Sequence, residues 1–463
     1  MTDALAFASI TALAEAYRRG EATPSAAVEA CIARSAALDD EIGAWQARYD
    51  DDARLAAEGA DRALRSGHVV GPFQGVPFAL KDIVDVEGRV TTGGSAARRD
   101  RVSPASATIA RRLVAAGGIL LGKTRTVEHA MGGWGTNQHM GTPWNPWDPR
   151  VARAPGGSSS GSGASVAAGM ATCAVGTDTG GSVRLPAAWC GIVGLKVTEG
   201  RLPTDGIIAL SHTLDTPGPM ARSVEDCVLM LEAMLGREPL ATERDWRRRD
   251  GLFAAVDAGA RGLRLGCLAP AEREGVDPEI LALYDAALER LRALGAQTTP
   301  FALPISFEAM RDRTGAIISV EGYHHHGALY EDRSAPLDED VRARFLAGRE
   351  VRAHDYVAAL RARLEDRAML LDRMRGLDAI LTPTVATPPV PVADIDQRTT
   401  PARFTRAGNY LGLCALSVPS GLTASGLPGA LQVIGRPGDE AMAVRIGAAF
   451  ERDRGPMPRP PMS

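Results

Sequence analysis

The chain has 463 residues, of which 45% are hydrophobic and 23% are charged, and its formal net charge is −4. This balance is typical of a soluble globular protein with a large buried core, and it excludes a disordered or fibrous chain. A slightly acidic chain also offers no basic surface for nucleic acid or anionic lipid, so neither is an expected partner.

Cysteine usage and the N-terminal segment indicate the compartment. The six cysteines are scattered, without a C-x-x-C pair or a closely spaced histidine, which predicts reduced core thiols and no metal site. The first twenty residues have the spacing of an amphipathic helix, with Glu15 inside the apolar stretch, and no run of 18 apolar residues follows. We therefore expect a cytoplasmic protein that makes no contact with a membrane.

The N-terminal part of the chain is predicted to be mainly helical. Hydrophobic periodicity predicts, in order, three helices, a buried strand that ends in a turn, a fourth helix and a short strand: 8–19, 24–38, 51–66, 75–86, 106–118 and 119–122. Thr23 and Pro24 suit the N-cap and the first position of the second helix.

Strands and helices alternate in the rest of the chain. Proline, glycine and serine dominate residues 141–164, and buried strands are then predicted at 171–178 and 191–196. Helices are predicted at 222–235, 277–295, 354–373 and 439–452, and strands at 263–268, 378–382, 415–419 and 429–435. This alternation predicts an α/β fold with a mixed, mostly parallel central sheet covered by helices on both faces. No linker or repeat marks a boundary, so we expect one domain over 1–463, with a frayed tail at 455–463.

The basic residues are distributed unevenly between lysine and arginine. All but three of the 52 are arginine, and the lysines are Lys81, Lys123 and Lys196. Arginine supplies a fixed charge, whereas lysine can lose its proton near neutral pH. A lysine kept against this bias is a candidate base, and the alternative is that all three are simply tolerated.

Two motifs suggest chemistry that their context does not support. The segment "GGILLGKT" (117–124) fits the phosphate-loop pattern, but its apolar centre predicts a strand after a helix, with Lys123 at the strand end. The segment "HHH" (324–326) lies in a predicted helix, where consecutive side chains diverge by about 100° and cannot meet at one metal. We expect solvated or capping histidines there.

The segment "GSSSG" (157–161) fits the G-x-S-x-G elbow of α/β-hydrolases, which would make Ser159 a nucleophile. Such an elbow follows a buried strand, and residues 150–155 form a poor one because Pro155 cannot donate to a sheet. An esterase of the α/β-hydrolase type that uses Ser159 is one alternative hypothesis.

Two clusters of glycine and serine, "PGGSSSGSGASVAAG" (155–169) and "GTDTGGS" (176–182), suggest an oxyanion hole. Glycine lets main-chain N–H groups point into a site without interference from a Cβ atom. The predicted donors to the oxygen that becomes negative when Ser182 attacks a carbonyl are the amides of Thr179, Gly180, Gly181 and Ser182. The alternative is that these glycines only let strands pack closely.

Four segments carry a family resemblance. In order, "ALKD" (79–82), "GGSSSG" (156–161), "GTDTGGSVRLPAAWCGIVGLK" (176–196) and "LDTPGPMARSVED" (214–226) resemble the amidase signature family of serine hydrolases. The resemblance is tight over a signature core at about 75–228. It covers nearly the whole chain, more loosely toward the C-terminus, and it implies the amidase signature fold. In this fold we expect N-terminal helices at 1–70 and C-terminal α/β elements at 229–455 around the signature core.

Carried over to this sequence, the family's Ser–Ser–Lys triad falls on Ser182 as nucleophile, Ser158 as bridging serine and Lys81 as base. The resemblance also implies a cis peptide bond between Gly157 and Ser158. Lys81 ends an apolar strand, where burial would lower its pKa from about 10.4 toward neutrality. The implied reaction is acyl transfer to water, with no metal or organic cofactor.

The residues around the triad are assigned to supporting roles. Asp178 and Arg184 are expected to shape the loop at 179–182. Ser160 stands where many relatives have glycine, and His129 replaces a common aromatic residue. These two departures bear on the shape of the pocket rather than on the triad.

The substrate follows only from the family. Its members act on aliphatic, aryl, peptide and fatty amides and on ureas, and some cleave esters or carbamates, the latter a urethanase activity. We expect a free-standing amidase for a small-molecule carboxamide, monomeric or homodimeric. The alternative is the glutamine-hydrolysing A subunit of a tRNA-dependent amidotransferase, which needs partner subunits. The predicted pocket residues are Met131, Gly132, Trp134 and Ile207.

Overall fold

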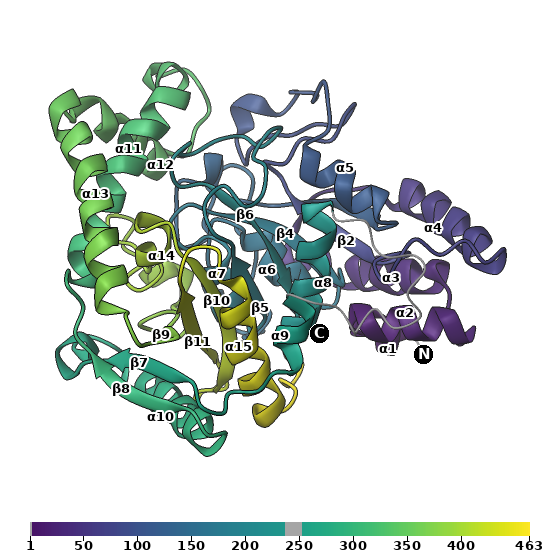
Figure 1. Cartoon of the computed structure of the whole chain (residues 1–463). Coiled ribbons are helices and arrows are strands. Elements are labelled where there is room, and N and C mark those ends of the chain that lie inside the picture. Colours follow the sequence, from purple (N-terminus) through teal and green to yellow (C-terminus); the bar gives the residue numbers. More distant parts are fainter. Residues whose placement is uncertain (1, 237–251) are drawn as a thin grey trace.

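The computed structural model describes residues 2–236 and 252–463 (Figure 1). The N-terminal helices are α1 Thr2–Ala6, α2 Ile10–Arg19, α3 Pro24–Ile42 and α4 Asp50–Arg65, with a short strand between α3 and α4. The three predicted N-terminal helices are confirmed, and the Thr23 hydroxyl accepts a hydrogen bond from Ala26 N–H at 3.1 Å, as an N-cap does. Helix α3 continues past residue 38 and ends where Gly43 takes a φ of 61°, a left-handed conformation that stops the helix.

Eleven strands of the described residues form one sheet, in the order β1-β3-β2-β4-β6-β5-β10-β11-β9-β7-β8. The strands are β1 Trp45–Arg48, β2 Pro77–Lys81, β3 Ile119–Thr124, β4 Cys173–Asp178, β5 Val193–Lys196, β6 Thr216–Ala221, β7 Arg264–Leu268, β8 Gln297–Phe301, β9 Ala379–Pro383, β10 Cys414–Leu422 and β11 Pro428–Gly435. Strands from both ends of the chain share this sheet. Strand β6 was not predicted, since Pro217 and Pro219 argue against a central strand.

The α/β class and the mixed sheet are confirmed, but the expectation of mostly parallel strands is wrong. Six of the ten described strand pairings are antiparallel, and four are parallel. Strand–helix–strand units do give parallel neighbours, as β2 and β3 do through α5 Thr108–Ala115. However, β6 inserts antiparallel between β4 and β5, and β10 and β11 form a hairpin. These two arrangements need no helical crossover, so helix–strand alternation could not reveal them.

Helices cover both faces of the sheet, as predicted (Figure 1). The remaining helices are α6 Ser160–Ala167, α7 Arg184–Cys190, α8 Val224–Leu235, α9 Leu252–Asp257, α10 Pro278–Ala293, α11 Phe307–Glu331, α12 Glu339–Leu346, α13 Ala353–Arg373, α14 Arg406–Tyr410 and α15 Glu440–Arg454. Successive strand residues such as Ala79 and Leu80 belong to different hydrophobic clusters, because they point to opposite faces. Helices α6 and α7 were missed because all their residues are buried, so no polar side marks the helical period.

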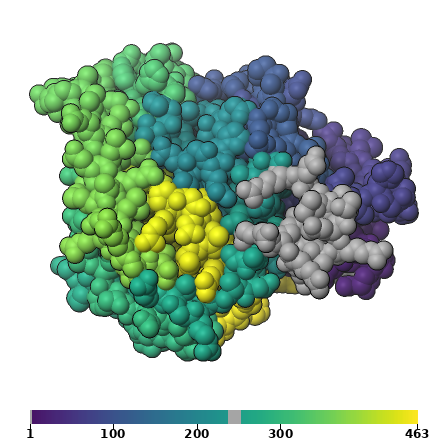
Figure 2. All heavy atoms as spheres, in the orientation of Figure 1, coloured from purple at the N-terminus to yellow at the C-terminus, as the bar shows by residue number. Residues whose placement is uncertain are grey.

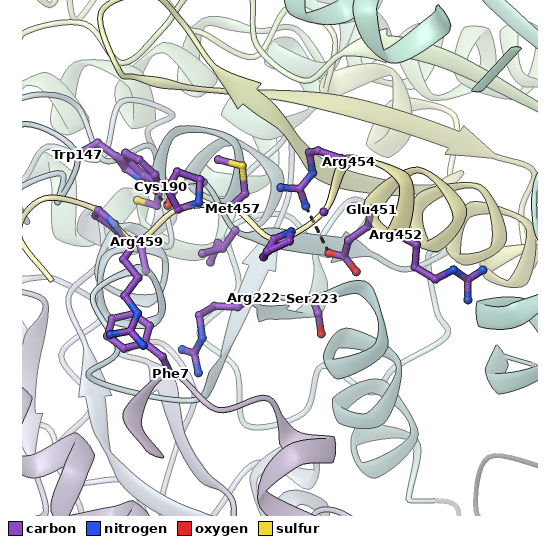
Figure 3. Close-up of a pocket in the computed structure, with 17 residues that line it drawn as sticks. Phe7, Trp147, Cys190, Arg222, Ser223, Glu451, Arg452, Arg454, Met457 and Arg459 are labelled. Carbon is purple, nitrogen blue, oxygen red and sulfur yellow. Dashed lines mark hydrogen bonds and ion pairs between the residues drawn. The ribbon is translucent and has the colours of Figure 1, made fainter. Parts of the chain in front are cut away.

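The C-terminal residues 455–463 are docked against the body, so the predicted frayed tail is wrong. Met462 is buried, and its N–H donates to the Pro146 carbonyl at 3.2 Å. The Arg459 guanidinium lies 4.2 Å from the centre of the Phe7 ring. Tail residues such as Met457 and Arg459 line a cavity of about 490 Å³ that Trp147 also lines (Figure 3). In Figure 2, the yellow patch at the surface lies where Figure 1 labels α15, between green and teal segments.

The cysteines lie in the core, as predicted. All six are buried and none forms a disulfide, and burial raises the pKa of Cys31 to about 12. Within the described ranges, no helix is both long and apolar enough to cross a membrane. The same ranges contain no group of three or more His, Cys, Asp or Glu residues able to hold a metal ion.

Candidate active site

Lys81 is the last residue of β2, which lies between β3 and β4 in the sheet. Its side chain is fully buried, and Nζ is hydrogen-bonded to Ser158 Oγ at 2.7 Å and to Thr177 Oγ1 at 2.8 Å. Burial lowers the pKa of Lys81 to about 7, although the charges of Asp215 and Asp178 act in the opposite direction. Lys81 is therefore able to accept a proton near neutral pH.

The other two lysines are also fully buried, but their partners differ. Lys123 pairs with the Asp82 carboxylate at 2.8 Å, and it lies in strand β3 rather than in a phosphate-binding loop, as predicted. Lys196 donates to the carbonyls of Val197 and Leu413, both at 2.8 Å. Only Lys81, of the three, contacts a serine of the two glycine-rich clusters.

Ser158 precedes α6 and follows a cis peptide bond with Gly157, as the family resemblance implied. Its carbonyl accepts hydrogen bonds from Thr126 Oγ1 at 2.8 Å and from Val127 N–H at 3.2 Å. A Cβ atom on Gly157 would lie 2.6 Å from the backbone nitrogen of Gly135, so only glycine fits there. This packing fixes the backbone at Ser158 while its hydroxyl meets Lys81.

Ser182 lies in the connection from β4 to α7. Its carbonyl accepts a hydrogen bond from Ser159 N–H at 3.3 Å, which joins the two glycine-rich clusters. Because β2 and β4 are parallel neighbours, the segments after them emerge at the same edge of the sheet. The loop that carries Ser182 therefore lies beside the segment of Ser158, whose hydroxyl is hydrogen-bonded to Lys81. Ser182 lines a cleft of about 80 Å³ and is 7% exposed, whereas the other two are fully buried.

Asp178 and Arg184 hold the loop that carries Ser182. Arg184 is fully buried, and its Nε and Nη2 each donate to the Asp178 carboxylate at 2.9 Å. Its guanidinium also donates to Thr405 C=O, Gln432 Oε1 and Asn409 Oδ1. Burial alone would raise the pKa of Asp178, but Arg184 outweighs it and the pKa falls to about 2. Both residues shape the loop, as expected.

The predicted set of oxyanion donors needs one correction. Gly181 N–H donates to Asp178 Oδ1 at 2.6 Å, so this amide already has an acceptor. Thr179, Gly180 and Ser182 line the cleft. The candidate oxyanion hole is therefore limited to the amides of these three residues, because the acidic side chain that begins the loop takes the fourth.

Removing Arg184 is expected to destabilise the fold strongly. The Arg184→Met variant leaves Asp178 as a buried charge without its partner, which costs about 3–5 kcal/mol. Urea unfolding monitored by circular dichroism would measure the loss. The double variant Arg184→Met/Asp178→Asn should recover part of it, because no charge is then left unpaired. A single-variant loss below about 1 kcal/mol would contradict this account.

Ser159 is not placed as a nucleophile. Its hydroxyl accepts from Thr177 N–H at 3.2 Å and donates to Thr177 C=O at 3.3 Å. The side chain is fully buried against strand β4, and it is not among the residues that line the cleft. The hypothesis of an α/β-hydrolase elbow is therefore not supported.

The predicted pocket residues divide into three groups. Met131 and Gly132 line the cleft beside Ser182. Ile207 lines a neighbouring cavity of about 90 Å³. Trp134 instead stacks on Trp189, with ring centres 5.6 Å apart, and does not line the cleft, although its Nε1 donates to the carbonyl of the lining residue Thr399.

Several cleft residues were missed because they come from distant parts of the chain. They are Ile318, Arg344, Thr399, Thr400, Ala402 and Arg406. In a chain whose basic residues are almost all arginine, no pattern distinguishes Arg344 and Arg406 from the others.

The three consecutive histidines lie in α11, as predicted, but not all are solvated. His326 is buried and stacks on His129, with ring centres 4.4 Å apart. Its Nε2 is hydrogen-bonded to the Ala209 carbonyl at 2.7 Å. The expectation is wrong for His326 because this side of the helix faces the segments that flank the cleft, which the local sequence does not show.

Comparison with known proteins gives consistent matches over most of the chain. The family model for amidase matches residues 26–444. The A subunit of the glutamyl-tRNA(Gln) amidotransferase of Anaeromyxobacter dehalogenans (strain 2CP-C) is 38% identical over 464 residues, 94% of each chain. The 2-amino-5-chloromuconic acid deaminase of Comamonas testosteroni is 37% identical and covers 96% of this chain and 95% of its own. A crystal structure of an amidase superposes with a TM-score of 0.87 at 29% identity, over 97% of this chain and 100% of that one.

Proposed function

Because this chain belongs to the amidase signature family of amidohydrolases, we propose that it cleaves a small carboxamide through an acyl-enzyme formed on Ser182. The observation that carries the proposal is the 2.7 Å hydrogen bond between Ser158 and a fully buried Lys81. Burial lowers the pKa of this lysine to about 7, so it can take the proton that Ser158 passes on. We further propose one domain over the chain, acting as a monomer or homodimer.

In the proposed acylation, Ser182 Oγ attacks the amide carbon. Its proton passes to Ser158 Oγ, while Ser158 gives its own proton to Lys81 Nζ. The carbonyl oxygen becomes negative and accepts hydrogen bonds from the amides of Thr179, Gly180 and Ser182. The C–N bond then breaks, Ser158 protonates the leaving amine, and Lys81 returns a proton to Ser158.

Deacylation repeats these steps with water. Lys81 takes a proton from water through Ser158, the resulting hydroxide adds to the acyl carbon, and the bond to Ser182 Oγ breaks. The proton returns to Ser182 as the acid leaves. Esters and carbamates present the same acyl carbon, so we propose them as further substrates. The scheme needs no metal or organic cofactor.

Covalent labelling identifies the nucleophile directly. A fluorophosphonate is expected to add one adduct to the native chain, located on Ser182 by intact mass and peptide mapping. Labelling should be much slower in Lys81→Ala, because Ser158 then lacks its proton acceptor. A label on Ser159, or no label on the folded chain, would sink the mechanism.

A second candidate is the glutamine-hydrolysing A subunit of a tRNA-dependent amidotransferase, favoured by the 38% identity to a protein of that kind. The two candidates differ in their need for partners. Turnover of amides by the purified chain alone favours the free-standing enzyme. Glutamine hydrolysis that appears only after the other amidotransferase subunits are added favours the alternative.

A further inference from the structure

The cleft beside Ser182 is positively charged on one side. Arg344 of α12 and Arg406 of α14 both line it. Of the described residues that line this cleft, none is an aspartate or glutamate. The two arginines differ in their hydrogen bonding, because Arg344 donates to the Met131 carbonyl at 2.8 Å and to Gln397 through its other terminal nitrogen.

The Arg406 guanidinium has N–H donors that form no hydrogen bond within the described residues. Its side chain runs along the glycine loop, since a Cβ atom on Gly180 would lie 3.3 Å from Arg406 Cγ and 3.5 Å from its Nε. Nη1 donates to the Arg311 carbonyl at 2.7 Å. Within the part of the chain that the structure describes, neither Nε nor Nη2 has an acceptor, and no carboxylate forms an ion pair with Arg406.

A partly buried cation without an ion-pair partner is unfavourable. Burial lowers the pKa of Arg406 to about 10, the like charges of Arg311 and Arg344 add to the effect, and the charge of Asp312 opposes it. Elsewhere in the protein, Arg184 binds the Asp178 carboxylate through its Nε and Nη2. In Arg406 the same edge has no acceptor among the described residues, but its Nε is shielded from solvent, whereas Nη2 is not among the buried atoms and is the donor open to a carboxylate.

We propose that the substrate of this enzyme carries a carboxylate, which Arg406 binds through Nη2 of its guanidinium while the amide carbon meets Ser182. This inference rests on the proposed function and names its substrate class: monoamides of short dicarboxylic acids. It also makes Arg406 a specificity-determining residue, because its carboxylate partner is supplied only by the substrate. An uncharged amide of the same shape leaves the guanidinium without a carboxylate partner.

Matched substrates test the inference. Succinamate and glutaramate carry the anion, whereas 4-oxopentanamide and 5-oxohexanamide replace the carboxylate with an acetyl group of similar shape. In the native enzyme, we expect kcat/KM to favour each anionic amide by about 10- to 100-fold, the effect of hydrogen bonds to a charged group. In Arg406→Gln this ratio should fall toward one, mainly through KM, and Arg406→Lys should restore part of it.

Arg311→Gln is the matched control, because it removes an equal charge from a side chain outside the cleft and keeps the carbonyl that binds Arg406. In Arg311→Gln the ratio of kcat/KM between the anionic and the neutral amide should stay near the native value. If it fell as far as in Arg406→Gln, the preference would come from the overall positive charge near the cleft, and the inference would be overturned. Calorimetry of glutaramate binding to Ser182→Ala, with and without Arg406→Gln, needs no turnover. Equal binding with and without Arg406 would also overturn it. If the fluorophosphonate labels Ser182 but the enzyme shows no preference for anionic amides, only this inference is refuted. If the fluorophosphonate does not label the folded chain, the proposed function is refuted as well.

Discussion

Ser182→Ala is expected to lower kcat for amide hydrolysis by at least about 10⁴-fold, since loss of a triad nucleophile removes the covalent path altogether. No neighbouring hydroxyl replaces it. Ser158 Oγ is hydrogen-bonded to Lys81 Nζ, and Ser159 Oγ is hydrogen-bonded to the backbone of Thr177. Initial rates of ammonia release from a responsive carboxamide would measure the loss. The fold should be unchanged by circular dichroism.

Ser159→Ala is the matched control for this prediction. It removes the same atom from an adjacent cluster, and leaves the N–H and C=O of Thr177 without a buried partner. We expect a lower free energy of unfolding, by about 1–3 kcal/mol, but kcat within about tenfold of the native value. If Ser182→Ala kept activity within tenfold while Ser159→Ala lost it, the assignment of the nucleophile would be wrong.

The sequence predicts elements best where one side of an element is polar or where caps mark its ends. Helix α3 was found through Thr23 and Pro24, whereas α6 and α7 are buried throughout and show no period. The mixed direction of the strands could not be read from helix–strand alternation, because β6 pairs across long sequence separations. Its prolines, moreover, argued against a strand.

The candidate site shows a similar division. Lys81 was marked by the shortage of lysines, yet all three lysines are buried, and only the family motif separates Lys81 from Lys123 and Lys196. Gly181 was assigned an oxyanion role that its hydrogen bond to Asp178 prevents. Arg406 could not be found at all, since its significance lies in acceptors that it lacks, and these are visible only in three dimensions.

Lys81→Met is expected to lower kcat/KM by about 10³-fold or more, and to remove a limb of the pH profile. The pKa of Lys81 is lowered to about 7 by burial, so below pH 7 the amine is protonated and cannot accept the proton of Ser158. In the native enzyme kcat/KM should therefore rise with pH, reach half its maximum near pH 7, and then level off. Rates measured from pH 5 to 9 test this.

Lys196→Met is the control, because Lys196 is equally buried and its pKa is lowered to about 8, but it bonds only backbone carbonyls. The rise near pH 7 should persist in this variant and vanish in Lys81→Met. The opposite result, or a half-maximum above pH 9 in the native enzyme, would reject Lys81 as the base.

The same lowered pKa has a consequence for stability. Between about pH 7 and pH 10.4 the unfolded chain keeps a proton on Lys81 that the folded chain releases, so this residue makes the free energy of unfolding rise with pH across that window. At pH 7 the buried amine thus opposes folding, and Lys81→Met should remove this pH dependence while abolishing activity. Urea unfolding of both forms at pH 7 and pH 9 would measure it. If the free energy of unfolding changed equally with pH in the native chain and in Lys81→Met, the pKa of Lys81 would be the same in the folded and unfolded chains. Burial would then not explain how Lys81 acts as a neutral base.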